Sequence, residues 1–239
     1  MNSNLRFQFG IRRLLLLVAA AGLFCAFAVP FFLRVYRQQK AIQWVRSFGR
    51  EPNFDAPNKS RKNTANNTTF VQETFSDVKR VHLDDKNLQE IGRLKDLPGL
   101  RHLEIASANV TDLSPLGNLR LLEHLSVSRN PISDISVVRN MPKLRRFYAY
   151  DTKIDSLEAF GESMQLEFVS LKNTNINNVE TLSRHRNLKY LDISATSVSD
   201  ISPLFECAML ETLIIKGTSV PDAQVDEISS KIPKCTITR

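Results

Sequence analysis

The sequence predicts an α/β solenoid, a right-handed superhelix of short strands and short helical turns with a parallel concave sheet, preceded by one transmembrane helix. Three observations carry this prediction. Apolar residues recur at a fixed interval of 22 from residue 78 to the end of the chain, an uncharged run of 20 residues lies near the N-terminus, and the excess of positive charge surrounds that run. With 42% hydrophobic residues among 239, the chain has enough apolar side chains for one sizeable core.

The charge distribution separates two parts of the chain. Residues 1–77 hold 11 Lys or Arg against 4 Asp or Glu, whereas residues 78–239 hold 21 of each. The positive excess therefore lies beside the most apolar segment, as is typical of the flanks of a membrane helix. The balanced C-terminal part argues against a nucleic-acid partner, which would favour a basic face.

A basic tail, residues 1–13, leads into the apolar run from Leu14 to Leu33. At 1.5 Å per residue this run spans about 30 Å, the thickness of a bilayer core, and predicts a single-pass signal anchor. Ala26-Phe27-Ala28 has the form of a signal-peptide cleavage site, which leaves a cleaved leader as the alternative. Retention is favoured because the apolar run continues to Leu33. A short basic tail normally stays cytoplasmic, so the C-terminal part is expected on the extracytoplasmic, periplasmic side.

Two segments separate the anchor from the periodic part. Residues 34–49 predict a juxtamembrane amphipathic helix that emerges from the membrane, because Ala41, Ile42, Val45 and Phe48 share one face and Gly49 ends it. Residues 50–77 are mostly polar and predict a linker and the N-terminal edge of the next domain.

Residues 78–239 form the periodic domain, with seven units and a closing strand. The first apolar position of each unit falls at Val78, Leu100, Leu122, Leu144, Leu166, Leu188 and Leu210, and Ile232, Cys235 and Ile237 hold positions 1, 4 and 6 of an eighth. Positions 4 and 6 alternate as in a strand, and positions 11, 14 and 17 return the chain over the other side of a coil. A single coil cannot bury its own apolar edge, so the coils must stack.

Two polar positions of the unit predict turns. Position 13 is expected to cap the convex turn that follows, through Asp112, Asp134, Asp200 and Asp222, with Ser156 and Asn178 as substitutes. Position 9 suits the turn that leaves the strand, through Asn130, Thr152, Thr174, Thr196 and Thr218.

The pattern L-x-x-L-x-L-x-x-T/N-x-I-x-D-I-x-x-L resembles the leucine-rich repeat, in particular the 22-residue type of the internalins and related bacterial proteins. The anchor, the "AIQWVRSFG" element and the "IPKCTI" ending are similar to membrane-anchored leucine-rich repeat proteins of planctomycete-type bacteria. This second resemblance implies a bacterial envelope protein of undefined activity.

In such a coil, positions 3, 5 and 7 face the concave surface, where repeat proteins generally bind their ligands. Aromatic and basic side chains collect there on neighbouring coils, and they form the predicted protein-binding site: Arg146, Tyr148, Tyr150, Phe168, Lys172 and Tyr190. Tyrosine and arginine are enriched at interface hot spots. The alternative is that these rings only pair across strands and stabilise the sheet.

Other reactive side chains predict no chemistry. No catalytic or phosphate-binding motif is present, so we expect neither an enzyme nor a cofactor. His102 and His124, with Glu104 and His82 beside them, are the one arrangement that resembles a metal site, and an ordinary polar ladder is favoured. Cys207 and Cys235 are expected to be inward-facing free thiols, and His185 a core histidine.

The sequence thus predicts a monomeric, membrane-anchored repeat protein that binds an unidentified protein partner through its concave sheet and catalyses no reaction. One alternative is a structural envelope component without a dedicated ligand. Another is a metal-dependent accessory activity at the concave histidines.

Overall fold

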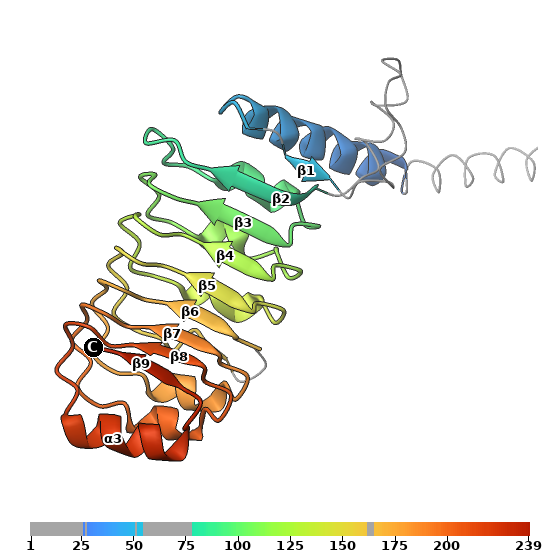
Figure 1. Cartoon of the computed structure of the whole chain (residues 1–239). Helices are drawn as coiled ribbons and strands as arrows, with labels where there is room; N and C mark the ends of the chain where they lie inside the picture. The colour runs from blue at the N-terminus through green and yellow to red at the C-terminus, as the bar shows by residue number, and fades with distance from the viewer. Residues whose placement is uncertain (1–25, 27, 51, 55–77, 162–164) are drawn as a thin grey trace, which may run out of the picture.

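The computed structural model describes residues 26, 28–50, 52–54, 78–161 and 165–239. Nine strands form one sheet in chain order from β1 to β9, in which β1 runs antiparallel to β2 and all later neighbours are parallel. Figure 1 shows the strands stacked one above another along the molecule. The predicted solenoid with a parallel sheet is confirmed.

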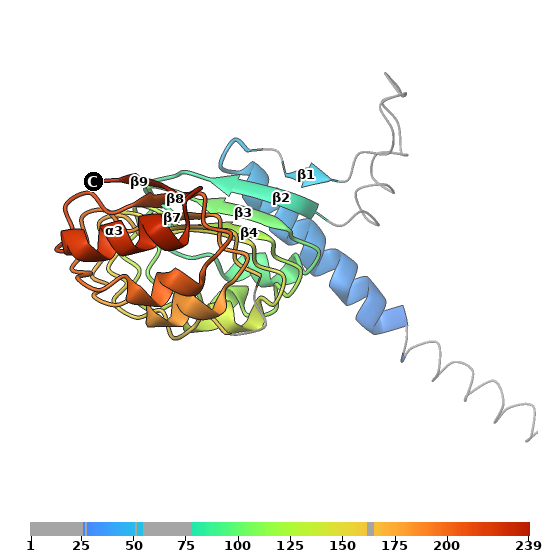
Figure 2. The ribbon, with the colours of Figure 1, turned by 60° about the horizontal axis from the view of Figure 1, so that its bottom comes forward.

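Strands β2 to β8 occupy the same part of successive repeat units: β2 (Val78–Leu83), β3 (His102–Ile105), β4 (His124–Ser126), β5 (Arg146–Tyr148), β6 (Phe168–Ser170), β7 (Tyr190–Asp192) and β8 (Thr212–Ile214). Strand β1 (Asn53–Phe54) precedes the first unit. The closing strand β9 (Thr236–Thr238) corrects the predicted eighth unit, because Ile237 and not Cys235 is the partner of Leu213, a step of 24 residues in place of 22. The return path of most coils contains a 3-10 helix: η1 (Gly92–Asp96), η2 (Ser114–Leu116), η3 (Ser136–Asn140), η4 (Glu180–Arg184) and η5 (Ser202–Glu206). One α-helix, α3 (Asp222–Lys231), ends the stack. In Figure 2 the strands line one side and these helices the other.

The core lies between the sheet and the helical side. Strand residues one unit apart are direct partners, as Leu103 and Leu125 show, so positions 4 and 6 stack into continuous apolar columns. These columns and those of positions 1, 11 and 14 are almost completely buried in successive coils. Each buried Leu, Ile or Val contributes roughly 1.5–3 kcal/mol relative to exposure, which makes stacking the dominant stabilising interaction.

The turn that follows each of the strands β3 to β8 adopts a left-handed backbone that the sequence did not predict. Position 8 has φ between 53° and 57° in five coils, although none of these residues is glycine: Ser107, Arg129, Asp151, Asn173 and Ala195. Each of their N–H groups donates to the position 7 carbonyl of the next coil, for example Asp151 to Lys172 over 2.9 Å. The left-handed residue thus extends the hydrogen-bond ladder beyond the strand and offsets the cost of its conformation.

The side chains at position 13 accept hydrogen bonds from the backbone that starts the next turn, as predicted. The N–H of Ser136 donates to Asp134 over 2.7 Å, that of Glu180 to Asn178 over 2.8 Å and that of Ser202 to Asp200 over 2.9 Å. Asp222 is the exception and corrects the prediction. It is the first residue of α3 and pairs with Arg239, because the seventh coil carries an α-helix in place of a 3-10 turn.

The two ends of the stack are closed differently. At the C-terminal end α3 buries Ile228, and the side chain of Gln224 donates to Asp200 over 2.9 Å and accepts from the N–H of Ile201 over 2.8 Å. At the N-terminal end a helix over residues 28–46 lies along the open end of the stack next to β2 (Figure 1), and it places Ala41, Ile42 and Val45 in the repeat core. The segment predicted to follow the membrane therefore also covers the first coil.

Most of the predicted anchor, Leu14 to Leu33, lies outside the described residues. Among those that the structure does describe, no helix combines the length and the apolar character needed to cross a bilayer. Residues 28–33 belong to the helix over 28–46, and Val29, Phe31, Phe32 and Leu33 are 46–65% exposed on it. These apolar side chains contrast with Ile42 and Val45, which are fully buried on the same helix.

Candidate binding face of the sheet

Positions 3, 5 and 7, which the sequence predicted to line the concave surface, form the side of the sheet that is turned away from the core. This side is called the outer face below. Its larger side chains are exposed or half-buried, including all six residues of the predicted site. Small polar residues between them are buried: Ser126, Ser128, Ser170, Asp192 and Ser194. Large rings and chains therefore form the accessible surface of the outer face.

Three of the predicted site residues form one row on adjacent strands. The rings of Phe168 and Tyr190 are stacked, with centroids 6.4 Å apart and planes 29° apart. The guanidinium of Arg146 lies 5.0 Å from the centroid of Phe168. Burial, the Asp192 carboxylate and Tyr148 raise the pKa of the Tyr190 hydroxyl, so this group stays neutral and able to donate a hydrogen bond.

The other predicted site residues have different neighbours. Tyr148 lies against His124, with ring centroids 5.3 Å apart, and Tyr150 lies under Arg129, whose guanidinium is 5.4 Å from its centroid. Lys172 is exposed one coil further. The sequence did not indicate Arg129, because the repeat pattern gave no role to position 8. This residue has a left-handed backbone, and its guanidinium lies over the ring of Tyr150 on the next coil.

The N-terminal half of the outer face is basic rather than aromatic. Position 3 presents Arg80, His102, His124 and Arg146 on four adjacent strands, paired directly in register. The two imidazole rings are stacked with centroids 5.8 Å apart. A hollow of ≈ 440 Å³ opens over this row, and His82 and Glu104 complete its lining.

The electrostatics of this basic half follow from its ion pairs. Glu104 accepts from His82 over 2.9 Å, Glu123 pairs with Arg101, and Glu167 with Arg145. In the described part of the chain, no carboxylate lies within ion-pair distance of Arg80 or Arg146.

Both stacked imidazoles have a lowered pKa. Burial is the main cause for His102 and His124, and the nearby guanidiniums add to it. The Nδ1 atom of His102 is shielded from solvent and has no hydrogen-bond partner among the described residues, which adds to the cost of charging that ring.

The histidines lie in one column as the sequence predicted, yet they are not arranged as a metal site. Throughout residues 78–161 and 165–239, and in the other described segments, no group of three or more His, Cys, Asp or Glu side chains could hold a metal ion. Glu104, the third candidate ligand, is engaged by His82. Two imidazoles without a third ligand are fewer than zinc sites use.

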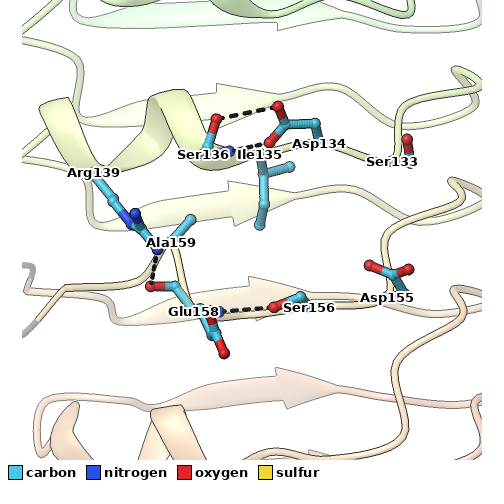
Figure 3. A pocket seen from close by; sticks show the side chains of 9 residues that line it. All are labelled: Ser133, Asp134, Ile135, Ser136, Arg139, Asp155, Ser156, Glu158 and Ala159. Carbon is cyan, nitrogen blue, oxygen red and sulfur yellow. Dashed lines mark hydrogen bonds between the residues drawn. The ribbon is translucent and has the colours of Figure 1, made fainter.

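A second hollow lies on the helical side, where η3 faces the fourth coil (Figure 3). The fourth coil has no 3-10 helix in its described residues, and a space of ≈ 350 Å³ is left beside it. Several of its polar groups are already engaged: Asp134 accepts from the first N–H of η3, Ser156 accepts from the N–H of Glu158 over 3.3 Å, and Arg139 donates to the carbonyl of Glu158 over 3.4 Å. The hollow is therefore a consequence of local packing.

The thiols and the core histidine also lie apart from the outer face. Cys207 is buried, which raises its pKa to about 11, and its thiol donates to the carbonyl of Leu182 over 3.5 Å. Cys235 is a free thiol too but only half-buried, because Ile237 takes its predicted place opposite Leu213. His185 is buried and packs edge-on against Phe160 with centroids 6.2 Å apart.

Comparison with known proteins identifies the architecture. No protein-family model and no curated protein matches this sequence. Among solved structures, a leucine-rich repeat protein of Leptospira interrogans is similar with a TM-score of 0.64 at 19% identity, over 71% of this chain and 45% of that one. An internalin (inlF) of Listeria monocytogenes gives 0.61 at 22% identity, over 64% and 44%. Internalin C2 of the same organism gives 0.57 at 20% identity, over 83% and 92%.

The chain spans less than half of the length of the first two of these structures. At such identities the likeness concerns the fold, and the whole proteins' partners do not carry over. The repeat period of 22, the parallel sheet and these neighbours together give the chain the fold of a leucine-rich repeat protein.

Proposed function

We propose that this chain is a membrane-anchored, non-catalytic module that binds a protein partner through the outer face of its sheet. The observation that carries the proposal is the row formed by Arg146, Phe168 and Tyr190, in which two large rings and a guanidinium lie side by side and partly exposed. Such groups contribute most at protein interfaces, since they bury a large area with few rotatable bonds.

The shape of this face also favours a macromolecular partner over a small metabolite. The outer face is an open sheet, and the hollow over its basic half is lined mainly by arginine, histidine and glutamate side chains. Small-molecule sites are concave and mostly apolar. A parallel sheet supported by a packed core presents a preformed surface, so binding orders few groups.

The membrane anchor is part of the proposal. The uncharged run from Leu14 to Leu33 and its arginine flanks support it. The exposed side chains of Val29, Phe31, Phe32 and Leu33 add support, because a cluster of exposed apolar side chains marks a surface that is buried against a membrane or a partner. The helix over residues 28–46 would then join the bilayer directly to the first coil, with the repeat domain on the extracytoplasmic side as a monomer.

Photo-crosslinking in membranes of the producing cell tests the binding face. Lys172→p-benzoylphenylalanine places the probe on the outer face, and Lys153→p-benzoylphenylalanine places it at an exposed turn of the preceding coil. We expect one dominant partner adduct from position 172, lost when Tyr190→Ala is added, and none from position 153. Equal adducts from both positions, or none from position 172, would support a structural envelope role instead.

The mass of the membrane-extracted chain tests the anchor. Retention of residues 14–33 is expected. A new N-terminus at Val29 would show that Ala28 ends a cleaved leader, and the chain would then be an exported protein without an anchor.

A further inference from the structure

We propose that the basic half of the outer face binds an extended acidic segment of the partner, with acidic side chains at alternating positions. The inference rests on the proposed function, because it uses the same face for binding. It adds the chemistry of the ligand and the residues that recognise it: Arg80, His102, His124 and Arg146, here called the position 3 row.

The spacing of the position 3 row favours an extended chain. Its four side chains are direct partners on the adjacent strands β2, β3, β4 and β5. Neighbouring strands lie about 4.8 Å apart, so the row from Arg80 to Arg146 measures about 14 Å. Side chains on one side of an extended peptide recur about every 6.7 Å, so three alternate carboxylates span about 13 Å.

The charges of the row favour carboxylates. Arg80 and Arg146 lie at its two ends without an ion-pair partner in the described part of the chain. The nearby carboxylates have other partners: Glu104 is engaged by His82, Glu123 by Arg101 and Glu167 by Arg145. A guanidinium binds a carboxylate through two parallel hydrogen bonds, which supplies both strength and orientation. Arg146 also rests on Phe168, which restrains its side chain before a ligand arrives.

The histidines between the arginines make this binding dependent on pH. His102 is close to Arg80, Arg101, Arg146 and Glu123, and His124 is close to His102, Arg80, Arg146 and Glu104. Their shielded, cation-rich surroundings disfavour the charged imidazole while the hollow is empty. A bound carboxylate reverses this balance, so binding takes up protons and becomes tighter as the pH falls.

A labelled peptide tests the inference on the full chain in detergent micelles. The probe is a rhodamine-labelled decapeptide of alternating Glu and Ser, with alternating Gln and Ser as its uncharged control, followed by fluorescence anisotropy at pH 7.5 and 5.5. We expect the Glu peptide to bind about tenfold more tightly at pH 5.5, because imidazoles charge in this window while glutamates stay ionised. The Gln peptide is expected not to bind.

Variants assign the effect to the position 3 row. Arg80→Gln and Arg146→Gln should each weaken binding of the Glu peptide about tenfold, the usual effect of losing one charged hydrogen-bond donor pair. His102→Gln with His124→Gln should remove the pH dependence and leave the affinity at pH 7.5 nearly unchanged. Lys216→Gln removes the same charge from the outer face at its other end and should have no effect. Circular dichroism checks that each variant is folded.

Several outcomes would overturn the inference. One is that Lys216→Gln weakens binding of the Glu peptide as much as Arg80→Gln does, which would indicate unspecific attraction. The others are an affinity for the Glu peptide that is independent of pH, and no binding of the Glu peptide at all. Tighter binding of a dT10 oligonucleotide than of the peptide would assign the row to nucleic acid. A partner adduct from position 172 that survives Arg80→Gln and Arg146→Gln but not Tyr190→Ala would reject the acidic ligand and leave the proposed binding module intact.

Discussion

Phe147 and Tyr148 are neighbours on β5, yet their rings lie on opposite sides of the sheet. Phe147 is fully buried and packs edge-on against Phe160, with centroids 5.3 Å apart. Tyr148 lies half-buried on the outer face beside His124. Two aromatic residues of nearly the same size therefore belong to two regions with different roles.

The inner columns repeat one chemistry along the stack, whereas the outer columns change it. Position 4 holds a large apolar residue in every coil, as in Leu103, Leu125, Phe147 and Leu191. Position 3 changes from Arg and His to Phe and Tyr between β5 and β6. The fold constrains the inner side in each coil, so the variation of the outer side is free to carry recognition.

Truncation of Phe147, the buried aromatic residue of β5, gives the largest expected effect on stability. Phe147→Ala should lower the free energy of unfolding by about 3–5 kcal/mol, because it removes buried area and leaves a cavity next to Phe160. Phe147→Leu introduces the residue that the preceding coil has at this position, Leu125, and should cost less, about 1–2 kcal/mol. Urea unfolding of both variants measures the difference. Equal midpoints would mean that the inner column is not tightly packed.

The N-terminal cover gives a smaller effect of the same kind. Ile42→Ala should cost about 2–3 kcal/mol, at the lower end for a buried Ile, because a helix at the end of the stack can shift toward the space left. Gln43→Ala on the exposed side of that helix should change stability by less than about 0.5 kcal/mol. If both variants unfold alike, residues 28–46 do not stabilise the repeat domain.

This role of the helix also decides which fragment of the chain is suitable for studying the repeat domain without the predicted anchor. A fragment that starts at residue 70 lacks Ala41, Ile42 and Val45 and exposes the edge of the first coil. A fragment that starts at residue 28 keeps this cover.

The capping carboxylates contribute a stability that depends on pH. The backbone N–H and the hydroxyl of Ser136 lower the pKa of Asp134, and those of Ser202 lower the pKa of Asp200. A lowered folded-state pKa gives stability that is present above the unfolded value near pH 4 and is lost as the pH falls through the folded value. Acid should therefore weaken both caps.

Asp134→Asn with Asp200→Asn tests this on the urea midpoint between pH 5 and pH 2. Asn178 makes the same bond in the fifth coil, so the double variant should be nearly as stable as the parent protein at pH 7 and lose less in acid. Asp155→Asn is the control, because it removes a nearby carboxylate that accepts no backbone N–H in the described residues. It should leave the acid response unchanged. An acid response unchanged in the double variant would show that the caps do not contribute.

The repeat explains how much of the molecule the sequence could predict. The period predicted the positions of strands β2 to β8, the buried columns and the caps at position 13 up to the sixth coil, since these follow from spacing alone. It missed the two-residue shift of β9 because α3 replaces the 3-10 turn before it. It did not reveal the left-handed backbone at position 8, because Arg129 and Ala195 carry no turn signal of their own. The helix over residues 28–46 was expected as an amphipathic segment, but its contact with the first coil depends on tertiary packing.

The outer face was predictable as a list of residues but not as pairs. Alternation along each strand put Tyr148 and Tyr190 on it correctly. The contact of Tyr148 with His124, and of Tyr150 with Arg129, depends on side-chain direction across strands.

The seventh coil has an α-helix in place of a 3-10 turn, and its sequence shows why. Asp226 occupies position 17, which is apolar in the other coils, while Val225 and Ile228 follow the spacing of an α-helix.

Truncation of the outer ring gives the smallest expected effect on folding. Tyr148→Ala removes a contact with His124 on the half-exposed face and opens no core cavity, so it should cost about 0.2–1 kcal/mol of stability, far less than Phe147→Ala one residue away. If the outer face binds a protein, the same change, or Tyr190→Ala, should weaken that binding by about 1–4 kcal/mol. Urea unfolding and the affinity for the crosslinked partner measure the two effects separately. Folded tyrosine variants that bind normally would exclude the outer face and point to the helical side.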